Sequence, residues 1–139
     1  MNTEKLLKAL DNEDNELLFN FTTEKILEMN LNILKELKMP REITMDYMRK
    51  LKEYRYIDEM NELKYGAYIR WIPINNPSQL PLVKGGVLCD IKINDNGVSI
   101  VCKGFHNRHF QFKMDESLIF QKLTDQEKVL LSALDHLSK

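Results

Sequence analysis

The chain has 139 residues, of which 43% are hydrophobic and 29% are charged, with a formal net charge of −1. This length and composition fit one domain with a buried core and exclude an intrinsically disordered chain. The sequence has no apolar run of the roughly 18 residues that a transmembrane helix needs, and it lacks the basic start and apolar stretch of a signal peptide. We therefore expect a cytoplasmic protein without membrane contact, with its two cysteines as free thiols.

Charge is segregated along the chain. Residues 1–36 carry eight acidic and four basic residues, whereas residues 63–114 carry seven basic and two acidic residues. Residues 115–139 are acidic again, with five acidic and three basic residues. Two interpretations are open. Either the acidic flanks pack on the cationic middle and neutralise it, or the middle exposes a basic surface to an acidic partner or a phosphate backbone.

The N-terminal part predicts two helices separated by a polar segment. Thr3 can cap a first helix, and the polar residues 11–15 are poor helix formers that should end it. A second helix should start in the threonine pair 22–23, and Pro40 should end it near Lys38. The crowded apolar residues of this part are Leu6, Leu7, Leu10, Leu17, Leu18, Phe19 and Phe21.

A third helix is predicted to begin after Thr44. Its apolar and aromatic residues recur mostly three positions apart, namely Tyr47, Met48, Leu51, Tyr54 and Ile57. We therefore expect residues 1–62 to form an N-terminal helical segment. Residues 63–139 should form a small β-barrel with a packed C-terminal helix.

Residues 86–104 are typical of a β-hairpin, because hydrophobic residues alternate on both sides of the turn signal Asn96-Gly97. The expected inner set is Val87, Cys89, Ile91, Ile93, Val98, Ile100 and Cys102. Two registers are open. A turn at residues 95–96 sets Cys89 opposite Cys102, and a turn at residues 96–97 sets Ile91 opposite Cys102.

Further short strands are expected around this hairpin. Residues 68–72 and 110–114 alternate in polarity, and residues 118–123 form either another strand or the entry to the last helix. Such a series of short strands predicts an α+β protein with a small antiparallel β-barrel, SH3-like or similar, over residues 65–123. An open antiparallel sheet covered by helices is the alternative.

The C-terminal helix has the clearest signature. Thr124-Asp-Gln-Glu127 is a capping box, in which the threonine hydroxyl accepts from the Glu127 amide and the carboxylate reaches back. An apolar stripe follows at helical spacing, consisting of Leu130, Ala133, Leu134 and Leu137.

One group of residues has the chemistry of a zinc site, namely Cys89, Cys102, His106 and His109. Structural zinc sites usually pair ligands two to four residues apart, whereas twelve residues separate these cysteines. The alternation places both cysteines on the apolar face, so we expect buried thiols and neither a metal nor a cofactor. No nucleophile elbow, P-loop or dinucleotide motif occurs, and we expect no enzymatic activity.

The loop Lys103-Gly-Phe-His-Asn-Arg-His109 combines basic and aromatic residues. Such a mixture can bind phosphate or stack on a base, although it also suits an ordinary polar turn. The candidate binding surface comprises Arg70, Trp71, Lys103, His106, Arg108 and His109.

Three segments carry a resemblance to a known group of proteins. The run from Tyr54 to Trp71, the pair Gly85-Gly86 and the run from Leu118 to Glu127 resemble uncharacterised proteins of large nucleocytoplasmic DNA viruses. The resemblance covers residues 54–137. It implies a small barrel with a helical tail in a non-enzymatic viral protein, a virion component or a protein of the host cytoplasm.

These observations favour an interaction or assembly module without catalytic activity, with a protein partner or self-association. A nucleic-acid-binding protein that uses the cationic barrel surface is the alternative. We expect the N-terminal helices to face the partner, because short helices need a surface that buries their apolar side chains. The other possibility is that they cap the open end of the barrel in the same chain.

Overall fold

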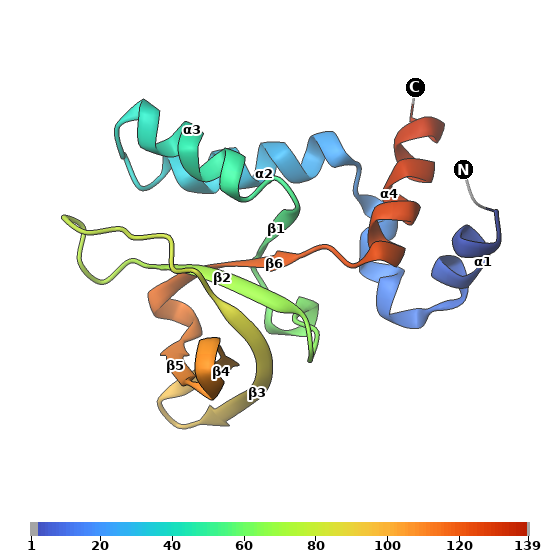
Figure 1. Ribbon diagram of the computed structural model, residues 1–139. Helices are drawn as coiled ribbons and strands as arrows, with labels where there is room; N and C mark the ends of the chain where they lie inside the picture. Colours follow the sequence, from blue (N-terminus) through green and yellow to red (C-terminus); the bar gives the residue numbers. More distant parts are fainter. Residues whose placement is uncertain (1–2, 139) are drawn as a thin grey trace.

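Figure 1 shows the computed structural model, which describes residues 3–138. The helices are α1 (Thr3–Asp11), α2 (Thr23–Lys35), α3 (Arg41–Lys50) and α4 (Asp125–Leu137). Single turns of 3₁₀ type and one longer 3₁₀ segment are η1 (Glu13–Asn20), η2 (Met60–Glu62), η3 (Phe105–Asn107) and η4 (Met114–Glu116). The strands are β1 (Tyr54–Ile57), β2 (Tyr68–Pro73), β3 (Gly86–Asn94), β4 (Gly97–Lys103), β5 (His109–Lys113) and β6 (Ser117–Lys122).

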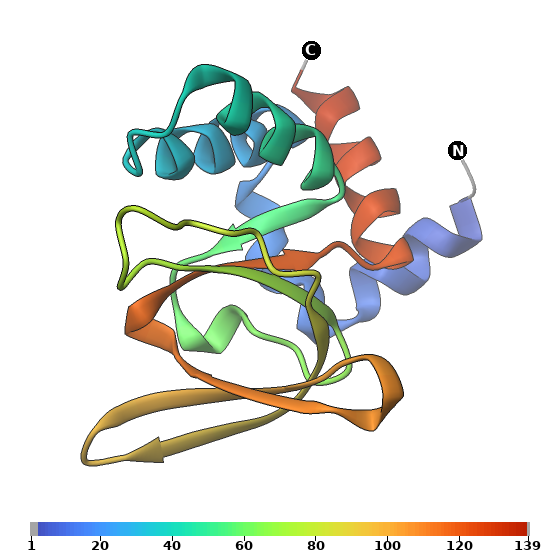
Figure 2. The same cartoon turned by 60° about the vertical axis from the view of Figure 1, so that its left-hand side comes forward.

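Within the described residues, six antiparallel strands form one sheet in the order β1-β6-β2-β3-β4-β5. The sheet curls strongly, as Figure 2 shows, but its end strands β1 and β5 do not pair within residues 3–138. A hollow of about 520 Å³ lies between the two ends, and its lining includes Ile57, Val98 and Met114. The expected closed barrel is therefore corrected to a curled open sheet, since closure requires hydrogen bonds between the two end strands.

The inner face of the curled sheet forms the main core. Trp71 of β2 is 4% exposed and stacks on Phe112 of β5, with ring centroids 4.3 Å apart. The buried residues of this core are Ile57, Leu63, Ile69, Trp71, Leu88, Ile100, Cys102 and Ile119. Because they come from β1, β2, β3, β4 and β6, the curl buries side chains from nearly the whole sheet.

Helices cover only one half of the outer face. A second cluster packs Ile72, Leu118 and Phe120 of β2 and β6 against Leu34 and Leu51, which come from α2 and the end of α3. Figure 1 shows α2 and α3 above this half of the sheet, whereas β3, β4 and β5 lie on the far side, away from these helices. Within residues 3–138, the outer face of β3, β4 and β5 is thus left without a helical cover.

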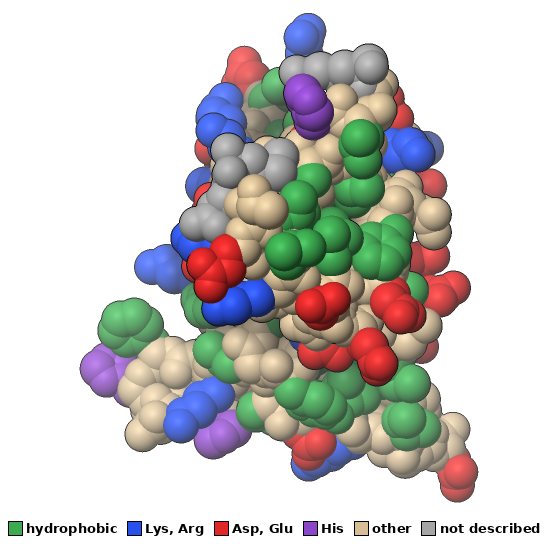
Figure 3. Space-filling model, turned by 90° about the vertical axis from the view of Figure 1, so that its right-hand side faces the viewer, with side chains coloured by type: hydrophobic (Ala, Val, Ile, Leu, Met, Phe, Trp, Pro, Cys, Tyr) green, Lys and Arg blue, Asp and Glu red, His purple; other side chains and the backbone are tan. Residues whose placement is uncertain are grey.

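The N-terminal helices pack against α4 in the same chain. Ala9, Leu18 and Ile26 are buried together with Leu130 and Leu131 of α4. Part of the apolar N-terminal set thus forms an intramolecular core, although on α4 rather than over the gap in the sheet. Leu6 and Phe21 are partly buried against this cluster, whereas other large apolar side chains at this end are exposed, namely Leu7, Leu10, Leu17, Phe19 and Leu137. Figure 3 shows hydrophobic side chains gathered on this helical end, with acidic side chains along one border.

The prediction of a helix that begins after Thr44 and extends to Ile57 is wrong at both ends. The helix α3 already begins at Arg41, directly after Pro40, and it ends at Lys50. Residues 54–57, assigned to this helix from their spacing, form β1 and pair with β6. Long-range pairing decides the secondary structure of these residues, because the hydrophobic pattern of so short a run fits a helix and a strand almost equally well.

The hairpin adopts the first of the two registers, since Asn94 pairs with Gly97 and residues 95–96 form the turn. A β-bulge lies between Leu88 and Asp90, however, so Leu88 rather than Cys89 lies opposite Cys102. Relative to strict alternation, the bulge moves each β3 residue on its N-terminal side to the opposite face of the sheet. As a result Leu88 is buried, while Val87 and Cys89 are exposed, which corrects the expected inner set.

Several local predictions are confirmed. The N-cap Thr22 of α2 accepts a hydrogen bond from the Lys25 amide, and the capping box joins Thr124 and Glu127 of α4 in both directions. The open choice for residues 118–123 is resolved as strand β6 for all but the last of them. Among the residues that the structure describes, no helix is long and apolar enough to cross a membrane.

Candidate functional site

A row of exposed side chains crosses the uncovered outer face at one end of the sheet. Tyr68 of β2 pairs with Val87 of β3, Val87 pairs with Lys103 of β4, and Lys103 pairs with His109 of β5. Directly opposed residues of antiparallel strands point to the same face, so these four side chains form one line. All four are exposed.

A second row crosses the same face nearer the β3–β4 turn. Lys92 pairs with Ser99, and Ser99 pairs with Lys113, which places one lysine on each side of a small residue. Lys92 and Lys113 are exposed. Between the rows lies Asp90, paired with Val101 of β4. The cationic face is the surface formed by Lys92, Lys103, His109 and Lys113, together with Arg108 from the adjoining turn.

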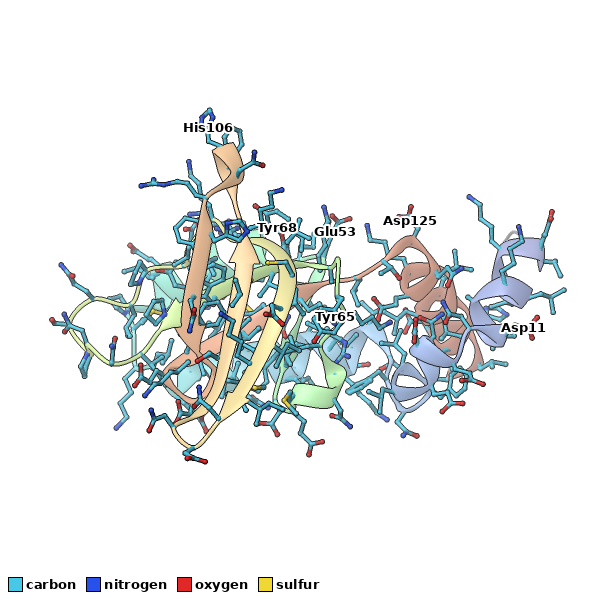
Figure 4. The ribbon with its side chains drawn as sticks, turned by 90° about the horizontal axis from the view of Figure 1, so that it is seen from below. Asp11, Glu53, Tyr65, Tyr68, His106 and Asp125 are labelled. Atoms are coloured by element: carbon cyan, nitrogen blue, oxygen red, sulfur yellow. The ribbon has the colours of Figure 1, made fainter. Side chains whose placement is uncertain are left out.

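The turn between β4 and β5 presents an aromatic side chain beside these cations. His106 and Asn107 have φ angles of 56° and 60°, and the Arg108 amide donates to the Phe105 carbonyl at 3.2 Å. Two consecutive residues with positive φ are typical of a type I′ turn, which matches the twist of a hairpin. Phe105 is 85% exposed at this turn, and Figure 4 shows His106 at the tip of the projecting hairpin.

A glycine pair lets β3 approach its two neighbours at the first row. A Cβ atom at Gly85 would lie 2.1 Å from the Ile69 carbonyl oxygen, and the φ angle of Gly85 is +93°. A Cβ atom at Gly86 would lie 2.7 Å from the Lys103 carbonyl oxygen. Larger residues at these positions would separate the strands and break the line from Tyr68 to His109.

The carboxylates that form ion pairs contact cations outside the cationic face. Glu127 pairs with Lys64 at 3.2 Å, and Glu62 pairs with Arg55 at 2.9 Å. Glu53 pairs with Lys128, outside the cationic face. Among residues 3–138, no ion pair includes a residue of the cationic face. Direct pairing therefore does not neutralise this surface, which favours the second of the two charge interpretations.

The structure divides the predicted surface residues into two groups. Lys103, His106, Arg108 and His109 are exposed on the β4–β5 hairpin. Trp71 lies on the inner face instead and offers no aromatic surface, and Arg70 is half-buried, with Nε donating to the Val83 carbonyl at 3.0 Å. The expected place of Trp71 on the binding surface is thus wrong, because adjacent strand residues such as Arg70 and Trp71 point to opposite faces.

Sequence reasoning missed Lys92, Lys113 and Tyr68 as members of this surface. The signal that could have found them is the combination of the turn at residues 95–96 with strict alternation, which places Lys92 opposite Ser99. Lys113 and Tyr68 required the pairing of β4 with β5 and of β2 with β3, which no local pattern specifies.

The cysteine–histidine group has no metal-site geometry. No group of three histidine, cysteine or acidic side chains within the described part of the chain could hold a metal ion. Cys89 is exposed, which corrects its expected burial, and its Sγ contacts the Val101 carbonyl at 3.3 Å. Cys102 is fully buried, and burial raises the pKa of its thiol to about 12.

A hollow of about 810 Å³ lies on the helical side, between α2, α4 and the turn before β1. Its charged groups already have structural roles. Lys128 pairs with Glu53 at 2.7 Å, and Asp135 accepts hydrogen bonds from the amide and hydroxyl of Thr23 at the start of α2. These contacts hold α2 and α4 together beside the hollow.

Comparison of the chain with protein-family models, curated proteins and solved structures finds no match. The cationic face is therefore the feature of the molecule from which a function can be inferred.

Proposed function

We propose that the protein is a non-enzymatic interaction module that binds an anionic partner through the cationic face. The observation that carries this proposal is the row from Tyr68 through Val87 and Lys103 to His109, on a sheet face without helical cover. In this proposal the curled open sheet is a rigid support for the hairpin. A virion component, which the viral resemblance implies, would use such a surface during assembly.

The rigid placement of the lysines on the sheet supports this role. The inner residues of the three strands, Leu88, Ile100 and Phe112, pack around Trp71, so the lysines project from strands that the core holds in place. Preorganised cations lose less conformational entropy on binding than cations in a disordered tail. The lack of ion pairs to these cations within residues 3–138 means that a partner need not displace a resident carboxylate.

Retention of the full chain on a heparin column, as a polyanionic matrix, tests this proposal. The variant Lys103→Ala/Arg108→Ala/Lys113→Ala should elute at clearly lower salt than the wild type, because ionic binding scales with the number of cations that engage. The matched control Lys25→Ala/Lys35→Ala/Lys52→Ala removes the same charge from exposed positions at the helical side and should elute with the wild type. Equal elution of the two variants, or no retention of the wild type, would contradict the proposal.

A further inference from the structure

We propose that the anionic partner is a single-stranded nucleic acid, an inference that rests on the proposed function of the cationic face. The distinguishing observation is that exposed aromatic side chains lie among the cations. Phe105 is 85% exposed and Tyr68 is 38% exposed. Proteins that bind single strands combine a basic surface for the backbone with aromatic rings on which the bases stack.

Phe105 is held outward by its turn. The Gly104 amide donates to the Arg108 carbonyl at 2.7 Å, which closes the hairpin directly beneath Phe105 and leaves its ring in solvent. The ring of His106 contacts that of Phe105 edge-on, with centroids 5.3 Å apart. A ring this exposed buries little area on folding, and a base plane would bury one of its faces.

Tyr68 lies at the other end of the same exposed row. Its hydroxyl donates to the Lys84 carbonyl at 3.0 Å, which fixes the ring beside Val87 and Lys103. Figure 4 shows Tyr68 below the hairpin tip that carries His106. The two exposed aromatic residues thus flank the first row of cations rather than lying behind it.

The length of the face suits a short segment of nucleic acid. Lys103 and Ser99 mark the two rows along β4, four residues apart, which corresponds to about 13 Å at a strand rise of about 3.3 Å per residue. At a spacing of about 3.4 Å per nucleotide in a stacked strand, this is about four nucleotides. A duplex hides its base faces inside the stack and could use only the cations. An acidic peptide would likewise gain little from Phe105.

Fluorescence anisotropy with the full chain separates these partners. The probes are a 20-nucleotide dT strand, a 20-nucleotide U strand and a 20-base-pair duplex, with a 20-residue polyglutamate as a competitor of similar charge to one strand. Single strands should bind more tightly than the duplex, and polyglutamate should displace them only at far higher concentration. Tighter binding of either the U or the dT strand supports the proposal and assigns the partner as RNA or DNA, respectively.

The variant Phe105→Ala should weaken single-strand binding by about fivefold or more, the range expected for losing one stacked base. Phe105→Tyr keeps a stacking ring and should bind like the wild type. Neither variant should change elution from heparin, since neither removes a charge. Duplex binding as tight as single-strand binding, displacement by polyglutamate at equal concentration, or unchanged binding by Phe105→Ala would overturn this inference. A wild type that heparin fails to retain would instead overturn the proposed function.

Discussion

The side-chain amide of Asn30 completes the free edge of β1 by hydrogen bonding to Tyr56. Its Oδ1 accepts from the Tyr56 amide at 2.8 Å, while its Nδ2 donates to the Tyr54 carbonyl at 2.9 Å. A side chain of α2 thus takes the place of a neighbouring strand. An open sheet needs such cover at its edges, because unpaired backbone groups invite pairing with other chains.

Asn30→Ala should therefore destabilise the protein by about 2–4 kcal/mol, since two backbone groups next to a buried side chain lose their partners. Urea unfolding followed by circular dichroism measures this change. Asn32 is exposed on the same helix, and Asn32→Ala should change stability by no more than about 0.5 kcal/mol. Equal stability of the two variants would show that Asn30 does not hold β1.

The two thiols should differ sharply in reactivity. A thiol reagent at pH 8 should modify one cysteine of the folded protein rapidly, and Cys89→Ser should abolish this fast phase. Cys102 should react only as the protein unfolds, because burial both blocks access and raises its thiol pKa to about 12. With the pKa about four units above the pH, only about one thiol in 10⁴ is ionised, a fraction that rises with pH. Two fast thiols in the folded wild type would contradict the burial of Cys102, and the absence of a fast thiol would contradict the exposure of Cys89 at the bulge.

Neighbouring leucines of η1 test whether the N-terminal helices belong to the intramolecular core. Leu18 is 1% exposed and packs in the cluster with Leu130 and Leu131, whereas Leu17 is 44% exposed. Leu18→Ala should cost about 2–5 kcal/mol in the free energy of unfolding, and Leu17→Ala about 0.5 kcal/mol or less.

Removal of residues 1–37 should expose the buried face of α4 and cause unfolding or aggregation. A truncated chain that stays folded and monomeric would instead support a partner-docking role for these helices.

Local signals predicted the fold where short-range chemistry decides the structure. The caps at Thr22 and Thr124 could be predicted because a helix cap depends on residues within one turn. The strand at residues 54–57 could not be predicted, since it forms by pairing with β6, more than sixty positions later in the chain. The open ends of the sheet also depend on twist and side-chain volume, which no local pattern specifies.

The candidate site likewise has a part that local signals predict and a part that depends on strand pairing. Charge segregation predicted a basic middle region, and the loop composition predicted the hairpin tip at residues 103–109. The bulge before Asp90 had no signature in the sequence, so the faces of Val87 and Cys89 were inverted. Membership of Lys113 in the surface followed only from its pairing with Ser99.

The salt dependence of binding to the 20-nucleotide dT strand tests the central claim most directly. Four lysine and arginine side chains of the cationic face, Lys92, Lys103, Arg108 and Lys113, should neutralise about four phosphates, which gives a slope of about −3 in a plot of log affinity against log salt concentration. The variant Lys103→Ala/Arg108→Ala should halve this slope, whereas Lys35→Ala/Lys52→Ala should leave it unchanged. A slope near zero in the wild type, or an equal loss of slope in both variants, would contradict binding through the cationic face.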